Sequence, residues 1–378
     1  MISTDRNIFD PASAVSKRMV DYGRVLGELH IVVFSLASGV YETTRLADNV
    51  MVYPTNSKSK LSYTTDAQLV GEEILSRIYF GQTAITTQDP FETASVGIKL
   101  KKKFGFPLQI QLHTDLYSPE FFDGSFMNWF RFQMSKFMFR RADGIRVVRE
   151  KIKEGLVKNL SIPAQKIIVL PVYVDTEKIR NAPITVNLKE KYSGWEHVVL
   201  VASRLSPEKN IPLALRAFSR LLDTNPAIGM VIVGQGSMDS KLKSLVRKLK
   251  LEHNVVFESW QNDLSSYYKT ADVFLNTSNF EGYGMTLVEA SAAGCPIITT
   301  NIGIAQDFLR DGKNALVCPV RDEKCLSNKL ITFFGNPLIR AQLRESIKSD
   351  SKQLDISYDG HLEKQKQSFE MLFETKKV

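Results

Sequence analysis

The chain has 378 residues, of which 43% are apolar and 24% charged, and its formal net charge is +8. At roughly 150 residues per domain this length predicts two domains, and the composition excludes a disordered chain. The longest apolar run, residues 30–40, is well short of the ~20 residues that span a bilayer. No signal peptide opens the sequence, so we expect a protein that is neither integral nor secreted.

The cysteines are Cys295, Cys318 and Cys325. Their spacing contains no CxxC or Cys/His pattern of the kind that indicates a disulfide framework or a zinc site. We therefore predict reduced thiols, a cytoplasmic location and no metal site.

Short β-branched runs alternate with helical segments, and this pattern occurs twice along the chain. Strands are predicted first at residues 29–36, 84–87, 108–112, 144–148 and 167–170. They are predicted again at 198–203, 230–233, 255–257, 273–276, 297–300 and 315–317, with helices such as 211–222 and 240–250 between them. The pattern is typical of parallel strands connected by helices, so each half is expected to form a doubly wound α/β sheet.

A polar, unpatterned stretch at residues 180–193 predicts the boundary, giving domains 1–180 and 181–357. Two such sheets that face each other leave a cleft at the carboxyl ends of their strands, where ligands of this architecture bind. We expect functional residues on the loops that follow strands.

The segment 279–296, NFEGYGMTLVEASAAGCP, runs from an acidic, glycine-containing turn into a helix. If the helix begins near Gly284, Glu281 lies in the preceding loop and Glu289 on the second turn. The amides of Gly284, Met285 and Thr286 then point outward and form an anion site, which fits a phosphate. The two carboxylates can accept hydrogen bonds from sugar and ribose hydroxyls. The alternative is an ordinary helix start with dipole-favoured acids.

Two cations follow the predicted strand 198–203. The segment SRLSPEKN places Arg204 and Lys209 on a loop stiffened by Pro207, where both can hold a diphosphate. The alternative is that they are solvated or paired with Glu208.

Two weaker signals lie at the ends of other strands. Gly234 and Gly236 form a GxG after the strand 230–233, a pattern that is also common in tight turns. His113 ends the strand 108–112 and faces the expected cleft, where it can donate a hydrogen bond to a sugar hydroxyl or help position the reacting carbon.

Together these segments resemble the retaining nucleotide-sugar glycosyltransferases of family 4, which have the GT-B fold. FEGYGMTLVEASAAGCPIITT resembles that family's E-x7-E signature, and SRLSPEKN resembles its diphosphate clamp. LPVYVDTEKI and ADGIRVVREKIKEGL resemble the inter-domain element and the strand and helix before it. Residues 358–375 resemble the terminal helix that crosses back to the first domain. The implied fold is GT-B, two facing Rossmann-like domains with an inter-domain cleft.

The resemblance also implies roles for individual residues. Glu281 and His113 are implied as catalytic residues that contact the donor sugar, Glu289 as a contact to the ribose, and Arg204 and Lys209 as contacts to the diphosphate. The remaining implied donor contacts are Gly234, Gly236, Trp260 in the base-binding segment, Gly282, Tyr283, Gly284, Met285 and Thr286. The loop at residues 7–13 departs from the family because it lacks the usual glycines.

We therefore expect a retaining transferase that moves a hexose from a nucleoside diphosphate sugar to a hydroxyl of a glycan or lipid-linked acceptor, without a metal or other cofactor. Two alternatives stay open: a catalytically inactive sugar-nucleotide-binding partner protein, favoured by the altered first loop, and a GT-B sugar phosphorylase. No recognition motif indicates a nucleic-acid partner.

Residues 99–158 contain 13 Lys and Arg against 6 Asp and Glu, and within them residues 121–141 read FFDGSFMNWFRFQMSKFMFRR. One interpretation of this stretch is a crossover helix packed on the sheet. The other is an interfacial helix that, with Lys99 and the lysines at 101–103, makes peripheral contact with an anionic membrane.

Overall fold

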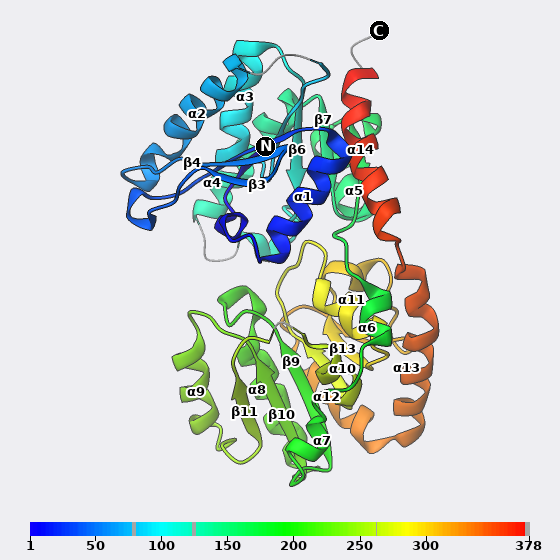
Figure 1. Ribbon diagram of the computed structural model, residues 1–378. Coiled ribbons are helices and arrows are strands. Elements are labelled where there is room, and N and C mark those ends of the chain that lie inside the picture. Colours follow the sequence, from blue (N-terminus) through cyan, green and yellow to red (C-terminus); the bar gives the residue numbers. More distant parts are fainter. Residues whose placement is uncertain (78–80, 123–125, 262, 375–378) are drawn as a thin grey trace. The chain divides into compact units, whose positions relative to one another are not determined.

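The computed structural model describes residues 1–77, 81–122, 126–261 and 263–374 (Figure 1). The chain divides into unit 1, Met1–Pro171 with Ser357–Val378, and unit 2, Val172–Ile356. The boundary predicted at residues 180–193 therefore lies inside unit 2. Helix α6 (Thr176–Asn181) belongs to unit 2 because it packs on α11 (Met285–Ala292), while Thr176 and Arg180 both bond to the Asp355 carboxylate.

Within the described residues, unit 1 contains an eight-stranded sheet in the order β3-β4-β2-β1-β5-β6-β7-β8. β3 is antiparallel to β4, and the other neighbours are parallel. The strands are β1 Ile2–Ser3, β2 Leu29–Val33, β3 Thr44–Ala47, β4 Val50–Pro54, β5 Ile85–Thr87, β6 Leu108–Leu112, β7 Gly144–Val147 and β8 Ile167–Val169. The helices are α1 Ala14–Leu26, α2 Tyr63–Arg77, α3 Glu92–Phe104, α4 Phe126–Arg141, α5 Glu150–Leu160 and α14 Tyr358–Glu374.

Within the described residues, unit 2 contains a six-stranded parallel sheet in the order β11-β10-β9-β12-β13-β14. The strands are β9 His197–Ala202, β10 Ile228–Val233, β11 Val255–Glu258, β12 Val273–Asn276, β13 Ile297–Thr300 and β14 Leu316–Cys318. Besides α6 and α11, the helices are α7 Leu188–Lys191, α8 Ile211–Leu222, α9 Asp239–Lys248, α10 Ser265–Thr270, α12 Glu323–Gly335 and α13 Pro337–Asp350.

Successive residues of β9 point to opposite faces of the unit 2 sheet, and both faces are buried. Val199 and Val201 join the core beneath α8, α9 and α12, whereas Val198, Leu200 and Ala202 join a second core with α10 and α11. A parallel strand covered on both sides needs apolar residues at every position, which is what a run of valines and leucines supplies. The sheet thereby holds its carboxyl-end loops at fixed positions.

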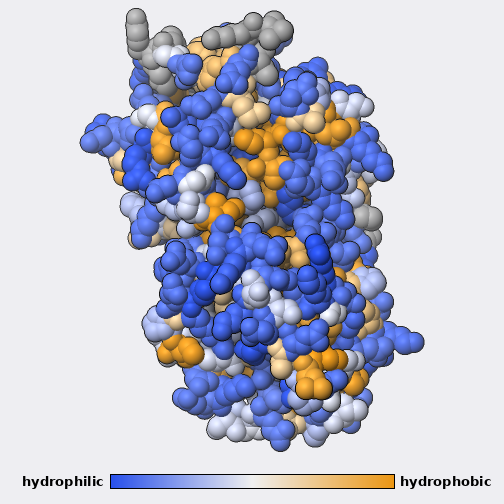
Figure 2. All heavy atoms as spheres, turned by 90° about the vertical axis from the view of Figure 1, so that its right-hand side faces the viewer, coloured by the Kyte–Doolittle hydropathy of each residue, from blue (hydrophilic) through white to orange (hydrophobic). Residues whose placement is uncertain are grey.

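The prediction of two doubly wound α/β sheets is confirmed. The sequence reading missed β3 and β4, because β3 is a half-exposed edge strand containing Arg45 and β4 ends in Pro54. The predicted terminal helix is present as α14, which lies beside α1 in unit 1 (Figure 1); Thr375 lies outside the described residues. Figure 2 shows that the outward surface over α14 is mostly hydrophilic, with apolar residues in small separate patches.

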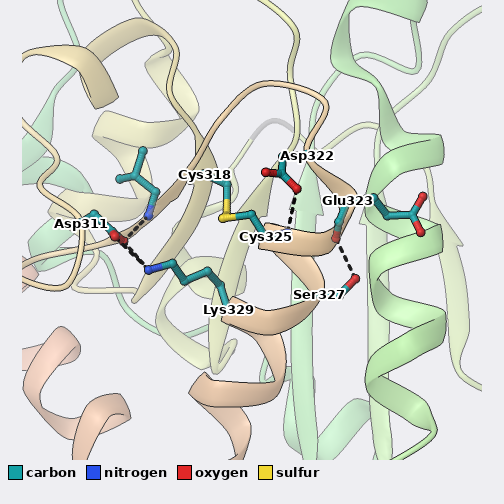
Figure 3. The surroundings of a disulfide bond; sticks show 8 residues. Asp311, Cys318, Asp322, Glu323, Cys325, Ser327 and Lys329 are labelled. Carbon is teal, nitrogen blue, oxygen red and sulfur yellow. Dashed lines mark hydrogen bonds and ion pairs between the residues drawn. A yellow bond between two sulfur atoms is a disulfide. The ribbon is translucent and has the colours of Figure 1, made fainter.

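The prediction of three reduced thiols is wrong for two of them. Cys318 ends β14, Cys325 lies in the first turn of α12, and a disulfide joins them across a Cα–Cα distance of 5.8 Å (Figure 3). Asp322 caps the helix by accepting from the Cys325 amide at 2.9 Å. The strand-to-helix turn brings the two cysteines together. The predicted cytoplasmic location was based on reduced thiols, so the cysteines no longer support it. Cys295 is a buried free thiol.

Across the described parts of both units, no helix combines the length and apolar character needed to cross a membrane.

Candidate active site

The loops after β9 and β12 meet through an ion pair in unit 2. Lys209 Nζ lies 2.5 Å from Glu281 Oε1, and the exposed fractions of the two side chains are 13% and 14%. Ser278 Oγ donates to the same carboxylate oxygen at 3.0 Å. Lys209 therefore pairs with Glu281, and the predicted alternative of a pair with Glu208 does not hold for it.

Further bonds fix these two loops to each other. Thr277 Oγ1 donates to the carbonyls of Lys209 and Asn210, and Asn210 Nδ2 donates to Asn279 Oδ1 at 2.9 Å. The backbone amide of Asn279 also donates to the Glu208 carbonyl at 2.8 Å. These bonds fix the loop that carries Lys209 to the loop that leads to Glu281.

Helix α11 begins at Met285, four residues after Glu281, which agrees with the predicted start near Gly284. Gly284 is its N-cap with φ 88°, a left-handed conformation that favours glycine. The amides of Gly284, Met285 and Thr286 precede the first intrahelical bond, because Leu287 and Val288 already donate to the Gly284 carbonyl. This end of the helix therefore presents donors and a positive dipole beside Lys209.

Gly303 is a site residue that the sequence reading missed. A Cβ at this position would lie 2.5 Å from the Tyr283 carbonyl and 3.2 Å from Glu281 Cβ, and its φ is 53°. The following amide, that of Ile304, donates to the Tyr283 carbonyl at 2.9 Å. Only glycine fits this close contact, which supports the turn that carries Glu281.

Glu289 lies on the second turn of α11, as predicted, and accepts a hydrogen bond from the Tyr268 hydroxyl at 3.0 Å. Desolvation raises the pKa of Glu289, while the bond from Tyr268 opposes the shift. Tyr268 is almost fully buried and was not singled out in the sequence, because a core tyrosine carries no motif. It orients a carboxylate that is otherwise available to a ligand.

Arg204 is placed differently from Lys209. Its side chain is 70% exposed and its Nη2 lies 3.3 Å from Glu208 Oε1. This is the exposed pairing that the sequence reading kept as an alternative, and such pairs stabilise little. The guanidinium can therefore exchange Glu208 for a more strongly charged ligand at small cost.

The two glycines of the GxG shape the Arg204 loop. A Cβ on Gly234 would lie 1.9 Å from the Ser203 carbonyl oxygen, and one on Gly236 would lie 2.3 Å from that of Leu205. The Leu205 amide donates to the Gln235 carbonyl at 2.9 Å. Close packing against the Arg204 loop thus explains why both positions are glycine. A direct contact of either glycine with a donor substrate stays a prediction.

Trp260 follows β11 and its side chain is exposed. The last residue of β11, Glu258, accepts bonds from Lys191 Nζ at 2.8 Å and from the hydroxyls of Tyr192 and Tyr267, each at 2.6 Å. These bonds lower the pKa of Glu258 against the desolvation that raises it. The ionised carboxylate anchors the start of the Trp260 loop.

His113 lies in unit 1, directly after β6, where it was predicted. Its Nε2 lies 3.2 Å from Gln111 Oε1. His113 is an exposed residue, and the pKa of its ring is lowered, first by partial desolvation and then by the positive charges of Arg146 and Arg18. The ring is neutral at pH 7.

The loop after β1 does not have a phosphate-loop shape. Residues Arg6–Phe9 form a short 3-10 turn, Ile8 is fully buried, and Ser13 caps α1 by accepting from the Ser16 amide at 3.0 Å. The structure gives this loop a packing role, and we assign it no donor contact.

The arrangement in unit 2 has a definite chemistry. A lysine, an exchangeable arginine and the start of a helix supply positive charge for a phosphate group, and Glu281 and Glu289 flank them as hydrogen-bond acceptors. Sites of this kind suit a diphosphate with hydroxyl-bearing groups on both sides. The class of protein defined by the fold and site is thus a two-domain α/β protein with a candidate site for a sugar nucleotide.

Family comparisons agree with this class. Residues 28–178 match the family model described as Glycosyltransferase Family 4, and residues 189–353 match the one described as Glycosyl transferases group 1. The chain belongs to glycosyltransferase family 4.

Curated relatives share about half of their length with this chain. A Campylobacter jejuni N-acetylgalactosamine-N,N'-diacetylbacillosaminyl-diphospho-undecaprenol 4-alpha-N-acetylgalactosaminyltransferase is 28% identical over 58% of this chain and 58% of its own length. An Escherichia coli UDP-Gal:alpha-D-GlcNAc-diphosphoundecaprenol alpha-1,3-galactosyltransferase is 31% identical over 54% and 50%. A Streptococcus pneumoniae alpha-monoglucosyldiacylglycerol synthase is 28% identical over 57% and 51%.

Solved structures show the same fold over nearly the whole chain. A sucrose-phosphate synthase from Thermosynechococcus elongatus has a TM-score of 0.78 at 17% identity, covering 99% of both chains. Anabaena Alr3699/HepE in complex with UDP-glucose has a TM-score of 0.72 at 18% identity, covering 93% of this chain and 94% of its own. The GT-B fold is thereby confirmed.

Proposed function

We propose that this protein is a retaining glycosyltransferase that moves a hexose from a nucleoside diphosphate sugar to a hydroxyl of a glycan or lipid-linked acceptor. The observation that carries the proposal is the contact of Lys209 with Glu281 at the start of α11. One group of this pair suits a diphosphate and the other suits sugar hydroxyls, and they belong to one rigid pair of loops.

Sugar transfer from such a donor builds negative charge on the leaving diphosphate. Lys209, Arg204 and the α11 amides supply positive charge there, so we propose that the chain needs no metal for this step. Glu281 holds the sugar hydroxyls, and Glu289, oriented by Tyr268, holds the ribose. The leaving phosphate takes the proton of the acceptor hydroxyl, and His113 contacts the donor sugar.

Names of relatives and neighbours support the choice of donor and acceptor. One relative is named for UDP-Gal and an undecaprenol diphosphate acceptor, another for a glucosyldiacylglycerol, and HepE has been crystallised with UDP-glucose. We therefore propose a UDP-sugar as donor and a lipid-linked or membrane-surface glycan as acceptor, used at the cytoplasmic face of a membrane.

The test is turnover of UDP-glucose, UDP-galactose, UDP-GlcNAc and UDP-GalNAc by the full chain, followed by ¹H NMR, with and without a lipid extract. We expect one donor to be consumed and to give an α-configured product. In Glu281→Ala the rate of donor turnover should fall at least 100-fold. Glu345→Ala, an exposed glutamate on α13, is the matched control.

Two results would replace the proposal. Sugar phosphate release that depends on inorganic phosphate would indicate a phosphorylase. Nucleotide binding without turnover of any donor, with or without lipid, would indicate an inactive partner protein.

Helix α4 supports the membrane part of the proposal. Its buried residues are Ser135, Met138 and Phe139, so part of the helix packs on unit 1 as a crossover helix does. A second stripe is open to solvent, with exposed fractions of 80% for Phe126, 49% for Trp129, 52% for Phe130 and 50% for Phe137. The crossover interpretation therefore describes the buried face of this helix, and the interfacial interpretation stays a prediction for its exposed stripe.

Basic side chains accompany the exposed stripe. Arg141 lies over the Phe137 ring, its Cζ 3.2 Å from the ring centroid, and Lys136 lies over the Phe132 ring at 4.3 Å. Exposed aromatic residues flanked by Lys and Arg are the composition of helices that lie in the headgroup region of anionic bilayers. We propose an anionic bilayer surface as the partner of this stripe.

Co-sedimentation with vesicles of phosphatidylglycerol and phosphatidylcholine tests this contact. We expect the wild type to bind at low salt and Trp129→Ser/Phe130→Ser to lose most binding. Leu338→Ser removes an apolar residue from α13 that is 80% exposed, more than either Trp129 or Phe130, and should bind like the wild type. Equal binding of the two variants would show that α4 does not contact the bilayer.

A further inference from the structure

Over β5, β6 and β7, one face of the unit 1 sheet carries polar side chains that are buried. Gln109 and Gln111 alternate with Leu108, Ile110 and Leu112 along β6, and all five are buried. The apolar residues occupy one face of the strand, so both glutamines point to the other. A buried amide is costly unless it is hydrogen-bonded, so both glutamine side chains need hydrogen-bond partners inside unit 1.

The partners orient the Gln111 amide. Arg146 on β7 donates from Nη1 to Gln111 Oε1 at 3.2 Å, and Gln111 Nε2 donates to Thr86 Oγ1 on β5 at 3.0 Å. A guanidinium only donates, so the amide oxygen must face Arg146. Thr86 in turn donates its hydroxyl to Gln109 Oε1 at 3.3 Å, which leaves its oxygen free to accept from Gln111.

The orientation of this amide decides the tautomer of His113. His113 Nε2 lies 3.2 Å from the same Gln111 oxygen that accepts from Arg146. A carbonyl oxygen cannot donate, so Nε2 must carry the hydrogen. Because the ring is neutral at pH 7, Nδ1 is left unprotonated and can only accept.

We propose that Gln111, held by Arg146 and Thr86, is a positioning residue that fixes His113 in the Nε2–H tautomer and presents Nδ1 as an acceptor for a donor-sugar hydroxyl. The proposal rests on the proposed function for the identity of the ligand. It reverses the direction of the hydrogen bond expected from the sequence, in which His113 was the donor.

Arg146 is itself held in place. It is only 4% exposed, and its Nε finds no acceptor among the described residues. Desolvation lowers the pKa of the guanidinium and Tyr22 on α1 opposes this shift, while the Tyr22 hydroxyl lies 3.3 Å from His361 Nε2 on α14. A buried cation with these few partners is a costly group, which is consistent with a positioning role for its remaining bond to Gln111.

Histidine ¹⁵N NMR of the full chain tests the proposal directly, because two-bond ¹H–¹⁵N correlations distinguish the two neutral tautomers. The chain has only five histidines, and the His113→Ala spectrum assigns the ring. We expect the Nε2–H tautomer in the wild type and a mixture of tautomers in Gln111→Leu. Gln111→Glu keeps oxygens as acceptors and should restore the Nε2–H form.

Gln109→Leu is the matched control. Gln109 is equally buried on the same strand, but its Nε2 donates to Ser368 on α14 at 2.9 Å and not to the histidine. Its spectrum should show His113 unchanged. An Nδ1–H tautomer in the wild type, or an unchanged His113 signal in Gln111→Leu, overturns the proposal.

Turnover of the preferred UDP-sugar separates this inference from the proposed function. We expect kcat/KM to fall about tenfold in Gln111→Leu, the loss of about one hydrogen bond, and to recover in Gln111→Glu. If the tautomer shifts but Gln111→Leu turns over donor as fast as Gln109→Leu, the sugar-acceptor role of Nδ1 is overturned. If the wild type turns over no donor at all, the proposed function fails while the tautomer assignment stands.

Discussion

Replacing Lys209 by methionine separates the two partners of the central ion pair. Among the described residues, Glu281 would then keep one side-chain bond, from Ser278, and its own side chain is just 14% exposed. A hydrogen bond to a charged group contributes about 1.5–3 kcal/mol, and the carboxylate left behind is poorly solvated. We therefore expect Lys209→Met to lower the free energy of unfolding by about 2 kcal/mol, and Lys209→Met/Glu281→Gln to recover most of that loss.

The single variants Lys209→Met and Glu281→Gln should change UDP affinity in opposite directions. Without the ammonium group, the dissociation constant for UDP should rise about 10- to 100-fold, the equivalent of one charge-assisted bond. Glu281→Gln releases Lys209 from its partner and should leave UDP affinity unchanged or increase it. Isothermal titration calorimetry gives the affinity, and urea unfolding gives the stability.

Lys189→Met is the matched control, because Lys189 Nζ lies 2.9 Å from Asp272 Oδ1 in another lysine–carboxylate pair of unit 2. If Lys209→Met and Lys189→Met bind UDP equally well, Lys209 is not a diphosphate contact.

Other predictions concern the disulfide, Glu289 and the GxG loop. The Cys318–Cys325 bond closes a separation of 7 residues, so a double Cys→Ser variant should lose about 2 kcal/mol, seen as a lower Tm than the wild type without reductant and an equal Tm with it. Because burial raises the folded-state pKa of Glu289 above its unfolded value, ionisation destabilises the folded protein as the pH rises past about 4. The Tm advantage of Glu289→Gln should therefore grow between pH 4 and 7; a pH-independent difference would contradict this. Gly236→Ala places a Cβ 2.3 Å from the Leu205 carbonyl oxygen and should cost about 2 kcal/mol in urea unfolding, whereas a change under about 0.5 kcal/mol would show that the loop yields.

Regular parts of the fold could be predicted because their sequence signals are local. β12, β13 and α8 have the predicted bounds, since short runs of apolar and β-branched residues and a 3.6-residue apolar period mark buried elements. The place of Glu281 before α11 also follows from a local signal, a glycine before a helical pattern. β3 lacks such a signal because an edge strand is only half buried.

Contacts between distant segments could not be predicted. The bond from Tyr268 to Glu289 depends on how α10 packs on α11. Nothing in the spacing of Gln111 and Arg146 indicates that both bond to each other beside His113. Such pairs are set by strand order and register, which periodicity alone does not supply.

The most direct test of a sugar-nucleotide site in unit 2 is a thermal-shift series of the full chain with UDP, GDP, ADP and dTDP. A ligand that binds only the folded state stabilises it by about 2.7 kcal/mol at a hundred times its Kd. We predict that UDP raises the melting temperature more than the other three and that Arg204→Ala reduces this shift. No shift with any nucleotide at millimolar concentration would contradict the account, because Lys209, Arg204 and the start of α11 would then not form a diphosphate site.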